Sequence, residues 1–151
     1  MNLEENKLIK EVTEEVLDIL EVPATIEVEE NNEGYKINLH TEAPGLLIGY
    51  HGKTLNSLQT FLSVVLFKKI KEKIKILVDV NDYRQKREEV LKRMALSAAR
   101  KVRFSRKEEV LPPMPAFERK IIHLVLANEE GVETESQGEG KERRVVVKPK
   151  K

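Results

Sequence analysis

The sequence contains no cysteine. This absence excludes disulfide bonds, thiolate zinc sites and cysteine nucleophiles together. The chain also lacks any run of roughly 18 uncharged apolar residues, which a membrane-spanning helix requires. Its first residues, Met1 to Lys7, are polar and acidic, unlike a secretory signal. Apolar residues still make up 40% of the 151 positions, enough to form a core. We therefore expect a soluble, cytoplasmic protein without membrane insertion, built as one ordinary domain or two small ones.

Arginine is absent from the first half of the chain. Residues 1–80 contain nine Lys, no Arg and fourteen acidic residues, whereas residues 81–151 contain nine Lys, nine Arg and twelve acidic residues. The net charges are therefore −5 and +6. Arginine binds phosphate in a bidentate manner and stacks on bases, so the second half is the more plainly cationic. This asymmetry predicts two domains, residues 1–80 and residues 81–151.

The hydrophobic pattern of the first domain predicts the order helix, strand, strand, helix, turn, helix, strand. Apolar residues at helical spacing indicate a helix that ends before Pro23, and alternation across residues 24–41 indicates a hairpin. A short helical segment near 42–48 leads into a glycine turn, and a strong apolar stripe predicts a helix over about 53–70. Alternation from Ile74 to Val80 predicts the third strand.

The glycine turn, Gly49-Tyr50-His51-Gly52, is the main candidate binding site of this domain. Two glycines three residues apart allow positive φ and a close approach of backbone to ligand. Lys53 then begins a helix, whose N-terminal N–H groups favour phosphate. Tyr50 offers a stacking ring, and His51 a donor to phosphate. Ile48 precedes the turn and completes the candidate site.

The turn and its flanking elements resemble the bacterial (type II) KH domain, a single-stranded nucleic-acid module. The resemblance implies that the loop clamps about four backbone nucleotides. It also implies that bases lie in an aliphatic groove, for which we expect Leu47, Ile48, Leu55 and a strand edge. The variable pair of the turn departs from the family, which often has Lys or Arg there. The alternative interpretation is a structural turn with a solvated tip.

The second half begins with a predicted helix from Asn81, with Asn81 and Asp82 as candidate caps. Arg84 and Arg87 are expected in partly buried ion pairs. A proline-rich break at residues 111–115 precedes another helix, followed by a strand, a turn at 138–140 and a partner strand from Arg143 to Lys148. The expected buried side of the second helix consists of Phe117, Ile121, Leu124 and Val125.

That second helix carries Arg119, Lys120 and His123, the other candidate nucleic-acid-binding residues. Arg119 and His123 are four residues apart and share one face. With the surrounding Pro113-Met114, Val132-x-Thr134-x-Ser136-x-Gly138 and Arg144-Val145-Val146-Val147 patterns, this segment resembles the R-3-H single-strand-binding domain. Arg119 offers a planar fork to phosphate, and His123 a donor or a stacking face. The alternative interpretation makes His123 a half-buried helix residue and Arg119 a partner of Glu118 or of a nearby carboxylate.

A KH domain followed by an R-3-H domain resembles the bacterial Jag family, also called SpoIIIJ-associated or KhpB proteins. The resemblance implies an α+β fold of two small α/β domains, with a three-stranded KH sheet covered by helices on one face. It further implies RNA binding, a role in cell elongation and division, and a small KH-only partner protein. Many members carry an additional N-terminal domain that precedes the KH unit, and this chain starts at the KH unit.

We therefore expect a protein that binds single-stranded RNA, or single-stranded DNA, without catalysis, metal or cofactor. One rival is an enzyme such as a nuclease, but His40, His51 and His123 do not fall at metal-ligand spacing. The other rival is a protein-interaction adaptor. The acidic first 42 residues offer a surface better suited to a protein than to RNA.

Overall fold

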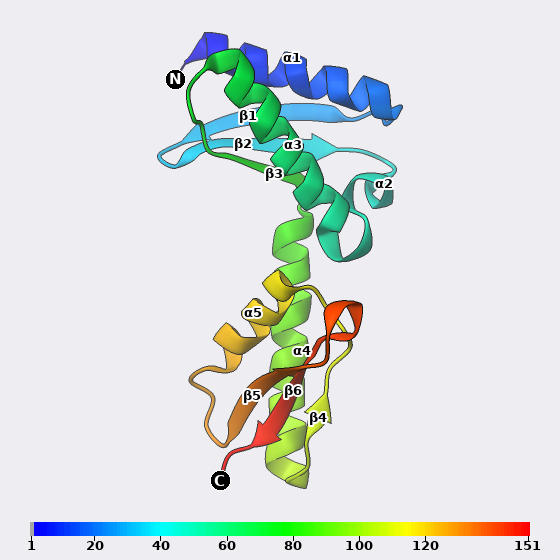
Figure 1. Cartoon of the computed structure of the whole chain (residues 1–151), viewed down its shortest axis with the longest axis vertical. Coiled ribbons are helices and arrows are strands. Elements are labelled where there is room, and N and C mark those ends of the chain that lie inside the picture. Colours follow the sequence, from blue (N-terminus) through cyan, green and yellow to red (C-terminus); the bar gives the residue numbers. More distant parts are fainter. Residues whose placement is uncertain (1) are drawn as a thin grey trace. The chain divides into compact units, whose positions relative to one another are not determined.

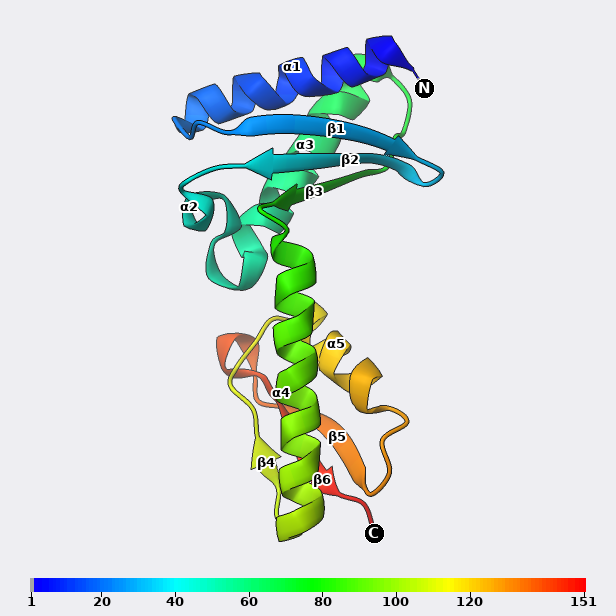
Figure 2. The same cartoon turned by 180° about the vertical axis from the view of Figure 1, so that it is seen from behind.

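The computed structural model describes residues 2–151. The chain divides into two compact units, with the division between Arg84 and Gln85 (Figures 1 and 2). Each unit has its own buried apolar cluster, so each has its own core.

The first unit contains a three-stranded sheet in the order β1-β2-β3. Its elements are α1 (Leu3–Leu20), β1 (Thr25–Asn31), β2 (Gly34–His40), α2 (Pro44–Ile48), the 3-10 turn η1 (Tyr50–Gly52), α3 (Lys53–Ile70) and β3 (Ile76–Val80). The hairpin strands β1 and β2 are antiparallel, whereas β3 runs parallel to β2. A parallel pair requires a long crossover, and α2, η1 and α3 form it. The predicted order of elements is confirmed.

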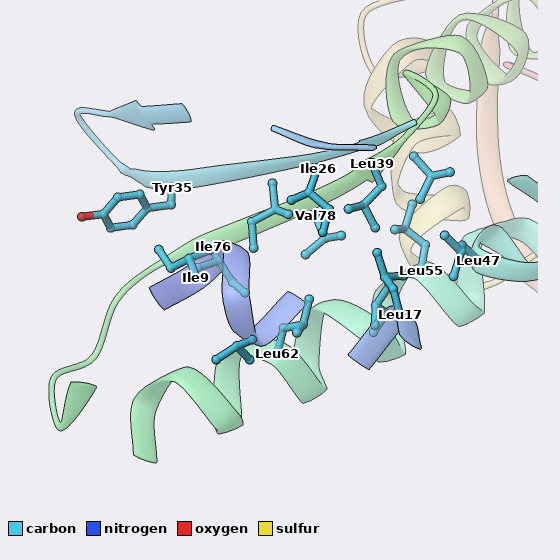
Figure 3. Close-up of a cluster of buried hydrophobic side chains, with 14 of the residues drawn as sticks. Ile9, Leu17, Ile26, Tyr35, Leu39, Leu47, Leu55, Leu62, Ile76 and Val78 are labelled. Atoms are coloured by element: carbon cyan, nitrogen blue, oxygen red, sulfur yellow. The ribbon is translucent and has the colours of Figure 1, made fainter. Parts of the chain in front are cut away.

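Helices α1 and α3 cover one face of this sheet. The alternating burial of β2 turns Tyr35, Ile37 and Leu39 toward the helices. These residues belong to the same buried cluster as Ile9 of α1 and Leu62 of α3, both completely buried. Figure 3 shows Tyr35 and Leu39 near opposite ends of this cluster. The opposite face of the sheet carries no helix within the described residues of this unit. The predicted three-stranded sheet with helices on one face is confirmed.

The second unit packs two helices against an antiparallel sheet in the order β4-β6-β5. Its elements are α4 (Tyr83–Ser105, whose first two residues belong to the first unit), β4 (Glu109–Val110), α5 (Ala116–Leu126), β5 (Val132–Gln137), the 3-10 turn η2 (Gly140–Glu142) and β6 (Arg144–Pro149). Leu91 and Ala95 of α4, Ile122 of α5 and Val145 of β6 are completely buried in one cluster. The two-residue strand β4 was not predicted, because so short an element has no measurable alternation.

The start of α4 differs from the prediction. Asn81 and Asp82 both have positive φ, 49° and 57°, and therefore form a turn before the helix. The Asn81 side chain binds the backbone of Thr41 at 2.8 and 3.0 Å. Asp79 takes the expected capping role, because its Oδ1 accepts the backbone N–H of Arg84 at 3.2 Å.

The predicted buried side of α5 is only partly correct, because Ile121 and Val125 are half-buried against the core but the other two residues are exposed. Phe117 and Leu124 are 40% and 65% exposed, and the buried residues of the helix are Glu118, Ile122 and Leu126. Glu118 is buried because Arg87 of α4 binds both of its carboxylate oxygens, at 2.9 Å each. The buried side of α5 is therefore shifted by one position relative to its apolar pattern, and a charged residue lies on it near the N-terminus.

Candidate nucleic-acid interface

The glycine turn reverses the chain between α2 and α3 by three unusual backbone conformations within four residues. Gly49, His51 and Gly52 have φ values of 70°, 52° and 80°. Glycine adopts this region without strain, and histidine is among the side chains that tolerate it best. The loop therefore holds a fixed shape between two helices.

Both positions require glycine, because neighbouring atoms lie close to each one and because φ is positive at each. A Cβ on Gly49 would lie 2.1 Å from Oγ1 of Thr54, and one on Gly52 would lie 3.0 Å from Cε1 of Tyr83. Thr54 belongs to the first turn of α3, so the loop lies directly against the start of that helix. Tyr83 is a residue that sequence analysis did not place at the site.

Three side chains gather at the tip of the loop. The rings of Tyr50 and His51 are 4.0 Å apart between centroids and tilted by 55°. The Nζ of Lys53 lies 5.4 Å from the centroid of Tyr50, within cation–π range. Tyr50 is 62% exposed, so most of its side chain remains accessible to a ligand. The loop thus presents one aromatic platform and one fixed positive charge.

The N-terminus of α3 is open to an anion. Among residues 2–151, no side chain caps this 18-residue helix, and its first turn contains no acidic residue. The first N–H groups of a helix have no partner within the helix, and the helix dipole adds positive potential there. This is the local geometry that favours a phosphate group.

The aliphatic groove expected beside the loop is not formed by the predicted residues. Leu47 is 1% exposed and Leu55 is 0% exposed, so both belong to the core. Ile48 is half-buried against the same core. Leu46, which is 68% exposed, is the apolar side chain that α2 presents to solvent. The prediction failed because these aliphatic residues hold α2 and α3 onto the sheet.

In the second unit, α5 brings Arg119, Lys120 and His123 to its less buried side. Lys120 is exposed, and Arg119 is half-buried. Arg119 does not have the pairing with Glu118 that the alternative interpretation expected, since that carboxylate binds Arg87.

His123 binds two hydroxyl groups of β5. Its Nδ1 lies 2.7 Å from Oγ1 of Thr134, and its Nε2 lies 2.8 Å from Oγ of Ser136. Both ring nitrogens are therefore engaged within the protein, and only the ring face remains for a ligand. Partial burial lowers the pKa of His123, and the charges of Arg119 and Arg143 lower it further. The contacts with Thr134 and Ser136 hold α5 against the sheet. Arg143 is a further cation near His123, and the sequence did not predict it.

The lowered pKa of His123 predicts a pH-dependent stability of the second unit. The folded state binds a proton on His123 less readily than the unfolded chain, whose histidine pKa is about 6.5. Stability is therefore lost as pH falls through the unfolded-state value. We expect a lower thermal unfolding midpoint for this unit at pH 5.5 than at pH 7.5, measured from the amide signals of α5 during heating. His123→Gln, which retains hydrogen-bonding groups without titrating, should reduce this pH dependence. An unchanged dependence would contradict the assignment to His123.

Two negative findings concern the described residues. Among residues 2–151, no group of three or more His, Asp or Glu side chains is arranged to hold a metal ion. No helix in the same range is long and apolar enough to cross a membrane.

Comparison with known families assigns each unit. Residues 6–80 match the KH domain of KhpA and KhpB, and residues 89–149 match the R-3-H domain. The chain belongs to the KhpB family. The resemblance to this family is confirmed, as is the α+β fold with a KH and an R-3-H domain.

Curated relatives support the same assignment. The RNA-binding protein KhpB of Lactiplantibacillus plantarum is 42% identical over 132 residues, which cover 87% of this chain and 41% of the relative. Proteins of the same name are 36% identical in Clostridium symbiosum, over 93% of this chain and 64% of the relative, and 36% identical in Bacillus subtilis, over 83% and 62%. The chain thus spans between about two fifths and two thirds of the length of these relatives.

Proposed function

We propose that this chain binds single-stranded RNA without catalysis or a cofactor, through a KH domain at residues 1–80 and an R-3-H domain at residues 81–151. The observation that carries the proposal is the Gly49–Gly52 loop at the uncapped N-terminus of α3. The relatives that are named RNA-binding proteins support RNA as the ligand.

In the first site, the RNA backbone passes over the loop from Ile48 to Lys53. The glycines allow close approach of a phosphate, the N–H groups of α3 face it, and Lys53 supplies a positive charge. Tyr50 stacks on a base, and His51 borders the same tip. This arrangement favours single strands, because stacking requires an unpaired base.

In the second site, Arg119 and Lys120 bind phosphates, while His123 orients the helix that carries them and offers its ring face. Arg119 provides the bidentate fork, and Lys120 a mobile charge. Two modest sites on one chain increase overall affinity through effective concentration.

Replacement of Arg119 and Lys120 by alanine tests the second site. We expect uniformly weaker binding of a labelled 12-nucleotide single-stranded RNA, measured by fluorescence anisotropy. The slope of log K against log salt should fall by about 1 to 1.5, since each phosphate contact on a single strand contributes about 0.7. Lys92→Ala with Arg93→Ala, an exposed pair of the same charges on α4, is the matched control. Equal effects of the two double variants would exclude Arg119 and Lys120 as a specific site.

At the level of the cell, we propose a cytoplasmic bacterial regulator linked to elongation and division. Single-stranded DNA is a competing ligand, and a small KH-only protein is a partner; both follow from the family resemblance. Competition of labelled RNA by DNA of the same sequence measures the preference directly.

A protein-interaction adaptor is the second candidate function, and one observation favours it. The outer face of α3 exposes large apolar side chains: Phe61 is 54% exposed, Val64 51% and Phe67 52%. Such a row is unusual on a surface that contacts only solvent. Partners that remain bound after nuclease treatment, without crosslinked RNA, would support the adaptor.

A further inference from the structure

Arg84 joins the edge of the first sheet to α3. Its Nε donates to the carbonyl oxygen of Val78 at 2.8 Å. Its Nη1 donates to Oδ1 of Asn56 at 3.0 Å, and its Nη2 donates to Oε1 of Gln59 at 3.1 Å. The same Gln59 oxygen also accepts the backbone N–H of Val78 at 2.9 Å. The guanidinium thus binds two amide side chains that lie three residues apart on one helix.

This network fixes the direction of both amides. A guanidinium and a backbone N–H only donate hydrogen bonds, so the atoms that face them must be the amide oxygens. The NH₂ groups of Asn56 and Gln59 therefore point away from Arg84. Among residues 2–151, the structure gives neither NH₂ group a hydrogen-bond partner. Two oriented pairs of donors remain available on the same side of α3.

The two donors lie close to the RNA-binding loop. Asn56 follows Lys53 by three residues, and Gln59 by six, so they lie about 4.5 and 9 Å further along the helix axis. Tyr83, the neighbour of Arg84, is the residue against which Gly52 packs. Arg84 and Tyr83 fall between the matched KH and R-3-H segments, which end at residue 80 and begin at residue 89.

Open surface borders both amides. Asn56 lines a shallow groove of about 500 Å³ together with Thr60, Phe61 and Val64. Gln59 lines a neighbouring groove of about 800 Å³ that also includes Thr60 and Val64. A base adjacent to the loop can therefore reach the amides and still contact apolar side chains.

We propose that Asn56 and Gln59 read one base of the bound RNA, and that Arg84 is the positioning residue that holds them in the donating orientation. This inference rests on the proposed function. Two neighbouring NH₂ donors match a base edge with two adjacent acceptors. Such edges are N3 and O2 of cytosine, or O6 and N7 of guanine. Uracil and adenine place a donor beside the acceptor on their corresponding edges.

Binding of four pentanucleotides to the full chain tests the inference. The probes are UUUUU, UUCUU, UUGUU and UUAUU, measured by fluorescence anisotropy at one salt concentration. Bidentate base contacts contribute about 1 to 3 kcal/mol of discrimination, so the C or the G probe should bind at least roughly fivefold more tightly than the U and A probes. Whichever of UUCUU and UUGUU binds more tightly shows whether the amides bind cytosine or guanine.

Asn56→Asp is the sharpest variant. A carboxylate still accepts the Arg84 hydrogen bond, so the network persists, but the NH₂ donors are lost. The ratio of the affinity for the favoured probe to the affinity for UUUUU should fall to about twofold or less. Each ratio compares probes of equal length and charge, so the added negative charge cancels. Asn32→Asp, in the exposed turn between β1 and β2, introduces the same charge elsewhere and should retain the preference.

Arg84→Ala tests positioning. Freed amides can rotate, so the preference should decrease while binding of UUUUU changes little. A purely structural loss would weaken all four probes equally and leave the ratio unchanged. Equal binding of the four probes by the natural chain, or an unaltered ratio in Asn56→Asp, would overturn the inference and leave RNA binding intact. Failure of every probe and of longer RNA to bind would overturn the proposed function as well.

Discussion

Replacing Arg87 with alanine is expected to destabilise the second unit by about 3 to 5 kcal/mol, the range for removing one partner of a buried ion pair. Glu118 is completely buried, and Arg87 binds both of its oxygens at 2.9 Å. Without the guanidinium, the carboxylate either stays charged in a poorly solvated place or takes up a proton. Both outcomes favour the unfolded state.

Urea unfolding must be followed for the second unit alone. All three tyrosines lie at or before residue 83, so tyrosine fluorescence reports on the first unit, and amide signals of α5 should be used for the second. Arg100→Ala is the matched control, because Arg100 lies on the exposed side of α4, the helix that also carries Arg87, and it should change stability by less than about 0.5 kcal/mol. Similar losses for the two variants would show that the ion pair is not what holds α5 in place.

Converting both residues between the glycines to aspartate is expected to weaken RNA binding by at least about tenfold. Tyr50→Asp removes a stacking surface, and stacking of one base on an aromatic ring contributes about 1 to 3 kcal/mol. His51→Asp adds a second negative charge where the backbone phosphate is expected. Aspartate tolerates the positive φ of His51, and the glycines remain, so the loop retains its shape.

This double variant separates binding from folding more cleanly than a glycine substitution, which would force a Cβ toward Thr54 or Tyr83. Fluorescence anisotropy with a short single-stranded RNA gives the affinity, and circular dichroism checks that the fold is retained. Glu29→Asp with Glu30→Asp, on β1, controls for general effects of double substitution. Undiminished affinity of the loop variant would show that the RNA does not cross the loop.

The elements of the first unit could be predicted because their signals are local. The apolar stripe of α3 predicted a helix over about 53–70, and the helix spans Lys53–Ile70. The alternation of apolar and polar residues in the hairpin and in β3 likewise predicted these strands from neighbouring residues. Where the prediction failed, a long-range contact overrode the local pattern. Glu118 lies in the core, where it binds Arg87, 31 residues away in the sequence. Asn81 binds Thr41, 40 residues away, in place of capping α4.

The candidate loop could be predicted for the same reason. Its two glycines, its aromatic residue and its lysine lie within five consecutive positions, so their spacing alone constrains the backbone. The residues around it could not be predicted. Whether Leu47 and Leu55 line a groove or a core depends on which surface the sheet covers. Tyr83 approaches Gly52, and Arg84 binds Asn56 and Gln59, only after the parallel crossover places β3 and the start of α4 beside α3.

The sequence by itself determined the two-unit organisation, the helices and strands, the loop and the family, because periodicity, glycine spacing and charge distribution act over neighbouring residues. The tertiary structure alone decided which polar atoms have partners. In the folded chain, both nitrogens of His123 bind hydroxyls of β5, and the amide oxygens of Asn56 and Gln59 face Arg84. Hydrogen bonding requires groups to lie about 3 Å apart, and only the folded chain brings together groups that are distant in sequence.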